Sequence, residues 1–151
     1  MAPSNQPPDS RGSSEAALQA VSEENVEVVR RSFEAFRRGG PDAMSDLFCD
    51  DVITYRADPD GATFDGKAGF RDAAADWAED FIEWQLLPQE FTDLGEEGVL
   101  VRVRQIAEGR SSGVRVDEDY WFLYELTGSK VSKLSSYSRH TDALKAAGLS
   151  E

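Results

Sequence analysis

The sequence predicts an α+β fold in which helices come first and an antiparallel sheet follows. Two observations support this class. Apolar residues recur at helical spacing in the first half of the chain, whereas strand-like alternation dominates from residue 82 to residue 139. The turns between the alternating segments are short and contain glycine, at residues 95–98, 109–113 and 128–130. Helices that precede a meander of strands define the α+β class.

The first helix is expected to begin at Ser22, whose side chain can cap the next backbone N–H groups. Its apolar stripe repeats every three or four residues, at Val26, Val29, Phe33 and Phe36. Gly39 and Gly40 are expected to end this helix, and Pro41 to open a shorter second one. A third helix is expected from about residue 66 to residue 80.

The sheet is expected to contain five strands. Strand-like sequences occupy residues 52–57, 82–91, 99–105, 114–126 and 131–139. The alternation slips at Leu87 and Pro88, which predicts a β-bulge because a bulge admits proline and re-aims side chains. Residues 58–61 have the chemistry of a loop, and residues 141–149 are expected to form a short closing helix.

Length and charge exclude several classes of protein. The chain has 151 residues, which suits a single domain. It carries 16 Lys and Arg against 29 Asp and Glu, and the net charge of −13 disfavours binding to nucleic acid or to an anionic membrane surface. No apolar run approaches the ~20 residues of a membrane-spanning helix. Residues 1–9 lack the basic and apolar regions of a secretory signal, so a cytoplasmic location is expected.

Residues 1–21 are expected to form a disordered tail, with a helix that could start as early as Glu15. They are rich in Pro, Ser, Gln and Ala and nearly lack large apolar side chains. The folded domain would then span residues 22–151. Cys49 is the only cysteine and His140 the only histidine, so neither a disulfide nor a dedicated transition-metal site is expected. His140 is expected at the surface near a helix start, and no cofactor is expected because no Gly-rich phosphate motif occurs.

Four stretches of the chain occur in an order that is typical of one superfamily. Residues 24–51 contain an opening helix, a glycine break and the exit Leu-Phe-Cys-Asp-Asp, and residues 57–72 contain an acidic loop with proline and glycine. Residues 118–138 contain an aromatic strand with its hairpin, and residues 142–151 a closing helix. Together these stretches resemble the SnoaL-like proteins of the nuclear transport factor 2-like superfamily, including many uncharacterised bacterial members, over about residues 22–151.

The resemblance implies a cone-shaped, strongly curved antiparallel sheet wrapped around a long N-terminal helix. This architecture is a cystatin-like α+β barrel with an apolar pocket. The resemblance also implies a homodimer through the outer sheet face. The superfamily includes isomerases, polyketide cyclases, epoxide hydrolases, dehydratases and members without chemistry, so the resemblance assigns no reaction.

The catalytic residues of ketosteroid-isomerase-like members are not matched. The resemblance places their carboxylate base at Arg56, which cannot accept a proton near neutral pH. Their tyrosine donor would fall near Ser32 or Phe33, and their protonated acid near Phe122. Asp58 could serve as the base only if its loop folds back.

The Arg-x-Asp pattern of epoxide-hydrolase-like members is also incomplete. On the corresponding strand, Arg102 and Arg104 flank a valine, so the first aspartate is missing. Residues 115–117 on the next strand contain an Arg-x-Asp pattern, but Asp117 is expected to face solvent. The comparison would turn Arg102 and Arg104 inward, whereas the alternating valines of residues 99–103 favour the opposite parity, and both orientations remain open.

Aromatic side chains of the predicted inner face could surround a cavity or simply fill the core. Glu118 interrupts the apolar face of the longest strand, and a buried carboxylate is costly unless it is paired. It could pair with Arg56, Arg102 or Arg104 and polarise a ligand, or it could lie solvated at the rim. The expected pocket residues are Phe33, Phe36, Tyr55, Arg56, Trp77, Trp84, Arg104, Glu118, Tyr120, Phe122 and Tyr124.

The sequence leaves three functions open. The first is a pocket for a small apolar or mixed-polarity ligand, without identified chemistry. The second is a cofactor-free isomerase, cyclase or dehydratase that uses Glu118 or Asp58 with a tyrosine or an arginine. The third is a non-catalytic, dimeric interaction module, in which the sheet face with Trp121 and Leu123 forms the interface.

Overall fold

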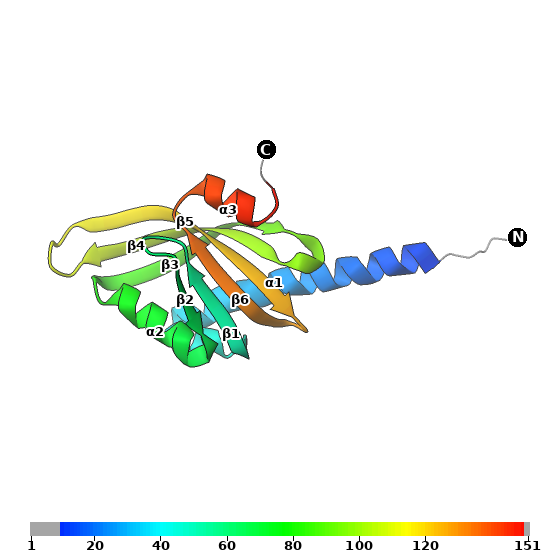
Figure 1. The fold of residues 1–151 in the computed structure, drawn as a ribbon, viewed down its shortest axis with the longest axis horizontal. Helices are drawn as coiled ribbons and strands as arrows, with labels where there is room; N and C mark the ends of the chain where they lie inside the picture. The colour runs from blue at the N-terminus through cyan, green and yellow to red at the C-terminus, as the bar shows by residue number, and fades with distance from the viewer. Residues whose placement is uncertain (1–9, 150–151) are drawn as a thin grey trace, which may run out of the picture.

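The computed structural model describes residues 10–149 and confirms the predicted class, a long N-terminal helix against a curved sheet (Figure 1). The helices are α1 (Ser10–Ser45), α2 (Gly66–Ala78), the 3-10 turn η2 (Gly95–Glu97) and α3 (His140–Ala146). The strands are β1 (Phe48–Arg56), β2 (Ala62–Asp65), β3 (Phe81–Asp93), β4 (Val99–Gly109), β5 (Arg115–Thr127) and β6 (Lys130–Tyr137).

The six strands form one sheet in the order β2-β1-β6-β5-β4-β3. The pairing of β1 with β6 is parallel, and the other neighbours are antiparallel. Because β2 and β3 are the two edges, the sheet is curved but does not close into a barrel. The register shifts between Pro88 and Glu90, which confirms the predicted bulge.

The first helix starts earlier than the sequence analysis expected. α1 begins at Ser10 rather than at Ser22 or Glu15. Residues 10–14 are therefore helical where a disordered tail was expected, and residues 15–21 take the helical alternative. The prolines of the segment all lie before Ser10, and residues 15–20 are mostly good helix formers, which explains the helix from residue 15. Residues 10–14 are rich in serine and glycine, and helix propensity does not explain their helical conformation. The remainder of the expected tail, residues 1–9, lies outside the described residues. Figure 1 shows the first turns of α1 extending past the sheet.

The predicted glycine break appears as a kink inside α1. Gly40 has φ 74° and ψ −160°, a conformation that is strained for any residue with a Cβ atom. Pro41 then starts the last turns of α1, where its missing N–H costs no hydrogen bond. The kink redirects the end of α1, and α1 contacts α2. Strand β2, which was not predicted, has only four residues and pairs with β1.

The core lies between α1 and the concave face of the sheet. Val28, Val29 and Phe33 pack in one cluster with the valines of β4 and with Tyr124 of β5. The inward orientation of Val99, Val101 and Val103 settles the parity of β4. Arg102 and Arg104 therefore face outward, so the orientation suggested by the epoxide-hydrolase comparison is wrong.

The outer face of the sheet is partly covered by the chain itself. Leu123 is buried in a second cluster with Leu100 and Ala143, because α3 packs on this face. The ring of Trp121 stacks on His140, with centroids 4.9 Å apart and an angle of 12° between the planes. Leu123 is thus not available to the expected dimer interface, and dimerisation itself stays a prediction.

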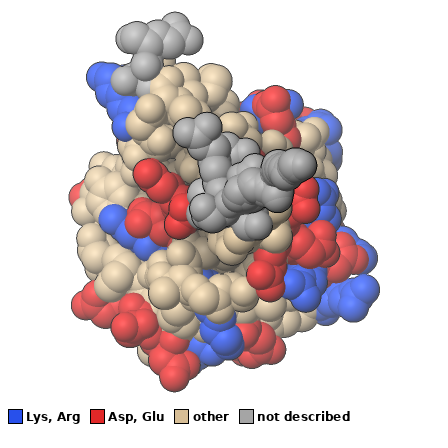
Figure 2. All heavy atoms as spheres, turned by 90° about the vertical axis from the view of Figure 1, so that its right-hand side faces the viewer, with Lys and Arg blue, Asp and Glu red and all other residues tan. Residues whose placement is uncertain are grey.

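Charged side chains of both signs are interspersed on the surface. On the outer face, Arg104 pairs with Asp117 at 2.7 Å and Arg102 with Asp119 at 3.3 Å. Figure 2 shows the same mixture on the side from which α1 extends, with no continuous basic area in this view. In residues 10–149, no helix is both long and apolar enough to span a membrane.

Candidate functional site

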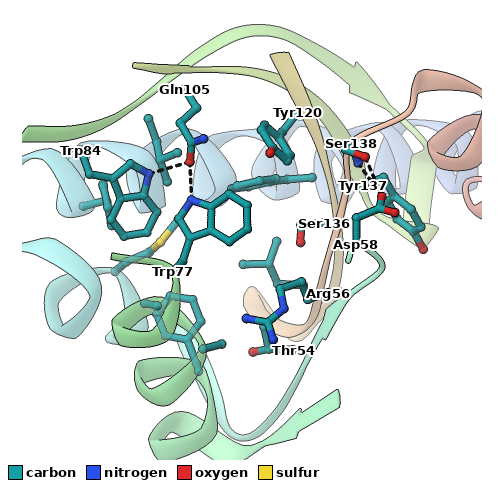
Figure 3. Close-up of a pocket in the computed structure, with 18 residues that line it drawn as sticks. Thr54, Arg56, Asp58, Trp77, Trp84, Gln105, Tyr120, Ser136, Tyr137 and Ser138 are labelled. Atoms are coloured by element: carbon teal, nitrogen blue, oxygen red, sulfur yellow. Dashed lines mark hydrogen bonds between the residues drawn. The ribbon is translucent and has the colours of Figure 1, made fainter. Parts of the chain in front are cut away.

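A pocket opens between the kinked end of α1, helix α2 and the concave face of the sheet (Figure 3). Its volume is about 100 Å³, several times the space that one water needs. Helix α2 presents one face to it, because its lining residues are spaced three or four positions apart. The apolar lining comprises Phe36, Met44, Phe70, Ala73, Ala74, Trp77, Trp84, Leu86, Phe122 and Leu134.

A buried glutamine joins two tryptophans at one side of this pocket. The indole N–H of Trp77 donates to Oε1 of Gln105 at 2.5 Å, and that of Trp84 donates to the same oxygen at 2.8 Å. The three side chains come from α2, β3 and β4, so this contact ties the helix to the sheet edge. Figure 3 shows both indole nitrogens directed at the amide oxygen.

Two polar atoms of the pocket lining are buried without a hydrogen-bond partner among the described residues. They are Nε2 of Gln105 and Oγ1 of Thr54. Gln105 is only 2% exposed and Thr54 only 8%. Burying an unpaired polar group costs free energy of about 1–3 kcal/mol. A partner from outside the chain, such as an ordered water, an ion or a ligand, would remove this cost.

Arg56 contributes a fixed positive charge to the pocket wall. Its guanidinium pairs with Asp60 at 3.0 Å and with Asp76 of α2 at 2.9 Å, and its side chain is only 12% exposed. The hydrogen bond to Asp60 is the main cause that raises the pKa of Arg56 above its ordinary value. The arginine therefore holds the β1–β2 turn and α2 together, and its charge is already paired.

Asp58 lies between β1 and β2 and is one of the residues that line the pocket. Its Oδ2 accepts hydrogen bonds from the hydroxyl of Ser138 at 2.7 Å and from the backbone N–H of Ser138 at 3.2 Å. These bonds lower the pKa of Asp58 below its ordinary value. A carboxylate with a lowered pKa is ionised at neutral pH and is a weakened base.

Tyr120 supplies a phenol to the same pocket and lies edge-on to Trp77, with ring centroids 5.7 Å apart. Burial raises the pKa of Tyr120, and the negative charges of Glu118 and Asp58 raise it further. The hydroxyl is therefore protonated at neutral pH and is available as a hydrogen-bond donor.

Of the residues expected in the pocket, six line it: Phe36, Arg56, Trp77, Trp84, Tyr120 and Phe122. Phe33 and Tyr124 instead fill the closed core beside the pocket, where both are buried. On β1, Thr54 and Arg56 line the pocket, and Tyr55 between them points to the other side of the strand. The ring centroids of Tyr55 and Tyr137 lie 6.2 Å apart. Arg104 faces outward, because the valines and Gln105 take the inward parity of β4.

Glu118 is exposed and does not line the pocket. It pairs in register with Gln105 near the start of β5, where the first residues of the strand are exposed. Among the described residues, none of the three candidate arginines pairs with it, because each already binds an aspartate. Of the two positions expected for Glu118, this placement agrees with a solvated residue at the rim and not with a buried pair with an arginine.

Sequence reasoning missed Gln105 and Thr54. Gln105 is the polar residue that follows three inward valines at the same parity, and this break in the pattern was the available signal. Residues 10–149 contain no group of three or more His, Cys, Asp or Glu side chains that could hold a metal ion.

The comparisons with known proteins agree with this fold. The SnoaL-like domain family matches residues 29–134, and the chain therefore belongs to this family. No curated protein matches the chain significantly.

Solved structures that resemble the chain are nuclear transport factor 2-like proteins. One from Burkholderia xenovorans LB400 is 27% identical, with a TM-score of 0.62 over 83% of this chain and 95% of the other. A protein from Jannaschia sp. CCS1, provisionally described as a SnoaL-like polyketide cyclase, is 19% identical, with a TM-score of 0.67 over 85% and 94%. AclR from Streptomyces galilaeus, provisionally described as a hydroxylase, is 15% identical, with a TM-score of 0.64 over 85% and 87%.

Proposed function

We propose that the protein binds one small, mainly apolar molecule in the pocket between α2 and the concave face of the sheet. The observation that carries this proposal is that the aromatic side chains there surround open space instead of filling it. Phe33 and Tyr124 close the adjacent core, whereas Trp77, Trp84 and Tyr120 stand around a volume of about 100 Å³. Pockets with apolar walls and a few convergent polar groups are the usual sites for small molecules.

Tryptophan fluorescence gives a direct test. The chain has three tryptophans, and Trp77 and Trp84 line the pocket while Trp121 lies on the outer face. In a Trp121→Phe background, a ligand in the pocket should change the emission of both remaining indoles. A panel of compact apolar and mixed-polarity molecules would be screened by this signal and by thermal stabilisation, which reaches about 2.7 kcal/mol at 100 times the Kd.

A matched pair of α2 variants separates pocket binding from binding elsewhere. Ala73 lines the pocket, whereas Ala75 on the same helix is exposed. Ala73→Phe should fill the space and abolish binding, and Ala75→Phe should leave it unchanged. Equal binding to both variants, or the lack of any ligand across a diverse panel, would overturn the proposal.

Acid–base catalysis is a second candidate function, and one observation favours it. Asp58 and Tyr120 line the same pocket, the first as a carboxylate and the second as a neutral phenol. Such a pair could remove a proton beside a carbonyl and stabilise the resulting oxyanion. Asp58→Asn should then abolish turnover of a bound ligand with little change in its Kd, whereas unchanged turnover would reject this candidate.

A further inference from the structure

The two tryptophans fix the orientation of the Gln105 side chain. An indole N–H is only a donor, and both indoles reach the same amide oxygen, at 2.5 and 2.8 Å. A flipped amide would place its NH2 group against two other donors. The assignment of Oε1 to the position between the two indoles is therefore fixed. Both lone pairs of this oxygen are used, so the amide cannot offer an acceptor to the pocket.

The NH2 group of Gln105 is consequently the part of this side chain that remains free. It is buried, it belongs to a residue of the pocket wall, and it has no partner among residues 10–149. A buried donor of this kind is costly until it meets an acceptor. Because Gln105 belongs to the pocket wall, an acceptor on a ligand in the pocket is the partner that a small shift of the lining side chains would bring to this group.

Thr54, the other unpartnered residue, does not discriminate in the same way. Its hydroxyl both donates and accepts, so it tolerates either kind of ligand group. It also lies on β1, which β5 and β6 separate from β4. At about 4.8 Å between neighbouring strands, the two positions are ~14 Å apart along the sheet. A ligand group that meets Gln105 is therefore out of reach of Thr54.

We propose that Gln105 is the specificity-determining residue of the pocket and selects ligands that present a hydrogen-bond acceptor, such as a ketone oxygen, to its NH2 group. Trp77 and Trp84 are positioning residues, because they hold the amide in the donating orientation. This inference rests on the proposed function and adds the chemical class of the ligand. It predicts discrimination against molecules of equal shape that present only a donor or no polar group.

Three bicyclic probes of similar size test this inference by calorimetry. 1-Indanone presents an acceptor, indole presents an N–H donor and indane presents neither. The wild-type protein should bind 1-indanone at least about tenfold more tightly than either indane or indole, since one unpaired buried donor is worth about a tenfold change or more. Equal affinities for 1-indanone and indane would overturn the inference and leave the proposed function intact. Failure of 1-indanone to bind would also overturn the inference, whereas the diverse panel decides the proposed function.

The variant Gln105→Glu should invert the preference. At alkaline pH its carboxylate can still accept from both indoles with one oxygen, and the other oxygen presents an acceptor in place of the donor. We expect 1-indanone to lose about tenfold in affinity and indole to gain, with indane almost unchanged. The exposed Gln85 provides the control variant Gln85→Glu, which adds the same charge outside the contact. An unaltered order of affinities in Gln105→Glu would reject the assigned role. If this variant does not fold, Tyr120→Phe decides: the preference for 1-indanone should persist in it, and loss of the preference would assign the donor to Tyr120 instead.

Discussion

The two ends of the concave face differ in whether their buried polar groups have partners. At the closed end, Tyr124 is fully buried and its hydroxyl lies 3.2 Å from that of Ser32, which itself donates to the carbonyl of Val29. At the open end, Gln105 and Thr54 keep unpartnered atoms beside a cavity. Both ends have the same kind of aromatic and aliphatic wall. At the closed end, the buried polar groups thus have their hydrogen bonds within the fold. At the open end, the missing hydrogen-bond partners leave positions that a ligand could fill.

The sharpest contrast between the ends is expected for two phenylalanines of α1. Phe33 is buried in the closed core, and Phe33→Ala should lower the free energy of unfolding by about 3–5 kcal/mol. Phe36 lines the pocket and contacts Trp84, and Phe36→Ala should cost less because it enlarges existing space. Urea denaturation of both variants measures the difference. Equal losses would mean that the two ends are packed alike.

The hydroxyl of Tyr124 should contribute to stability. Burial raises the pKa of this phenol, so that it stays protonated, and Ser32 provides its partner. Tyr124→Phe leaves the Ser32 hydroxyl with its bond to Val29 but removes one buried hydrogen bond. We expect a loss of about 1 kcal/mol in urea denaturation. A stability equal to that of the wild type would show that this bond is energetically neutral.

The hydroxyl of Thr54 should behave in the opposite way. Thr54→Val keeps the shape of the side chain and removes a buried hydroxyl that has no partner. The stability of the free protein should stay the same or rise by up to about 1 kcal/mol. A destabilised Thr54→Val variant would contradict the description of the open end as incomplete.

The smallest effect concerns Asp58 at the rim of the open end. Ser138→Ala removes the hydroxyl that is the main cause of the lowered pKa of Asp58, so this pKa should rise in an NMR titration. A lowered folded-state pKa contributes stability that is present above the ordinary pKa and is lost as the pH falls through the folded value. The variant should therefore lose less stability on acidification than the wild type. An unchanged Asp58 titration would refute the role of Ser138.

The fold could be predicted largely from the sequence because periodicity reports which side of an element is buried. The alternation in β5 and the apolar stripe of α1 are examples of patterns that predicted their elements correctly. The change of alternation at Leu87 and Pro88 predicted the bulge. The start of α1 was placed too late: good helix formers at residues 15–20 outweigh the polar composition there, and residues 10–14 extend the helix without a propensity signal of their own. The short strand β2 was missed because four residues carry little periodic signal.

The site was harder to predict for a physical reason. Phe33 and Phe36 belong to one apolar stripe, and the pattern cannot tell that one fills the core and the other faces a cavity. Glu118 and Arg104 were predicted to line the pocket because they are charged. Glu118 is instead exposed to solvent, and Arg104 forms an ion pair on the outer face. Gln105 is uncharged, and its importance depends on two indoles that only the folded chain brings together.

The most direct test of the account is an NMR titration of the 15N-labelled protein with 1-indanone, following the side-chain NH2 signals. The signal of Gln105 can be assigned by its loss in Gln105→Glu. This signal should shift on binding, together with backbone signals of α2, while signals of α3 and the outer face stay constant. A titration that shifts only the outer face would contradict the claim that the open end is a ligand site, and one that shifts α2 but leaves the Gln105 NH2 signal unmoved would contradict the role of Gln105.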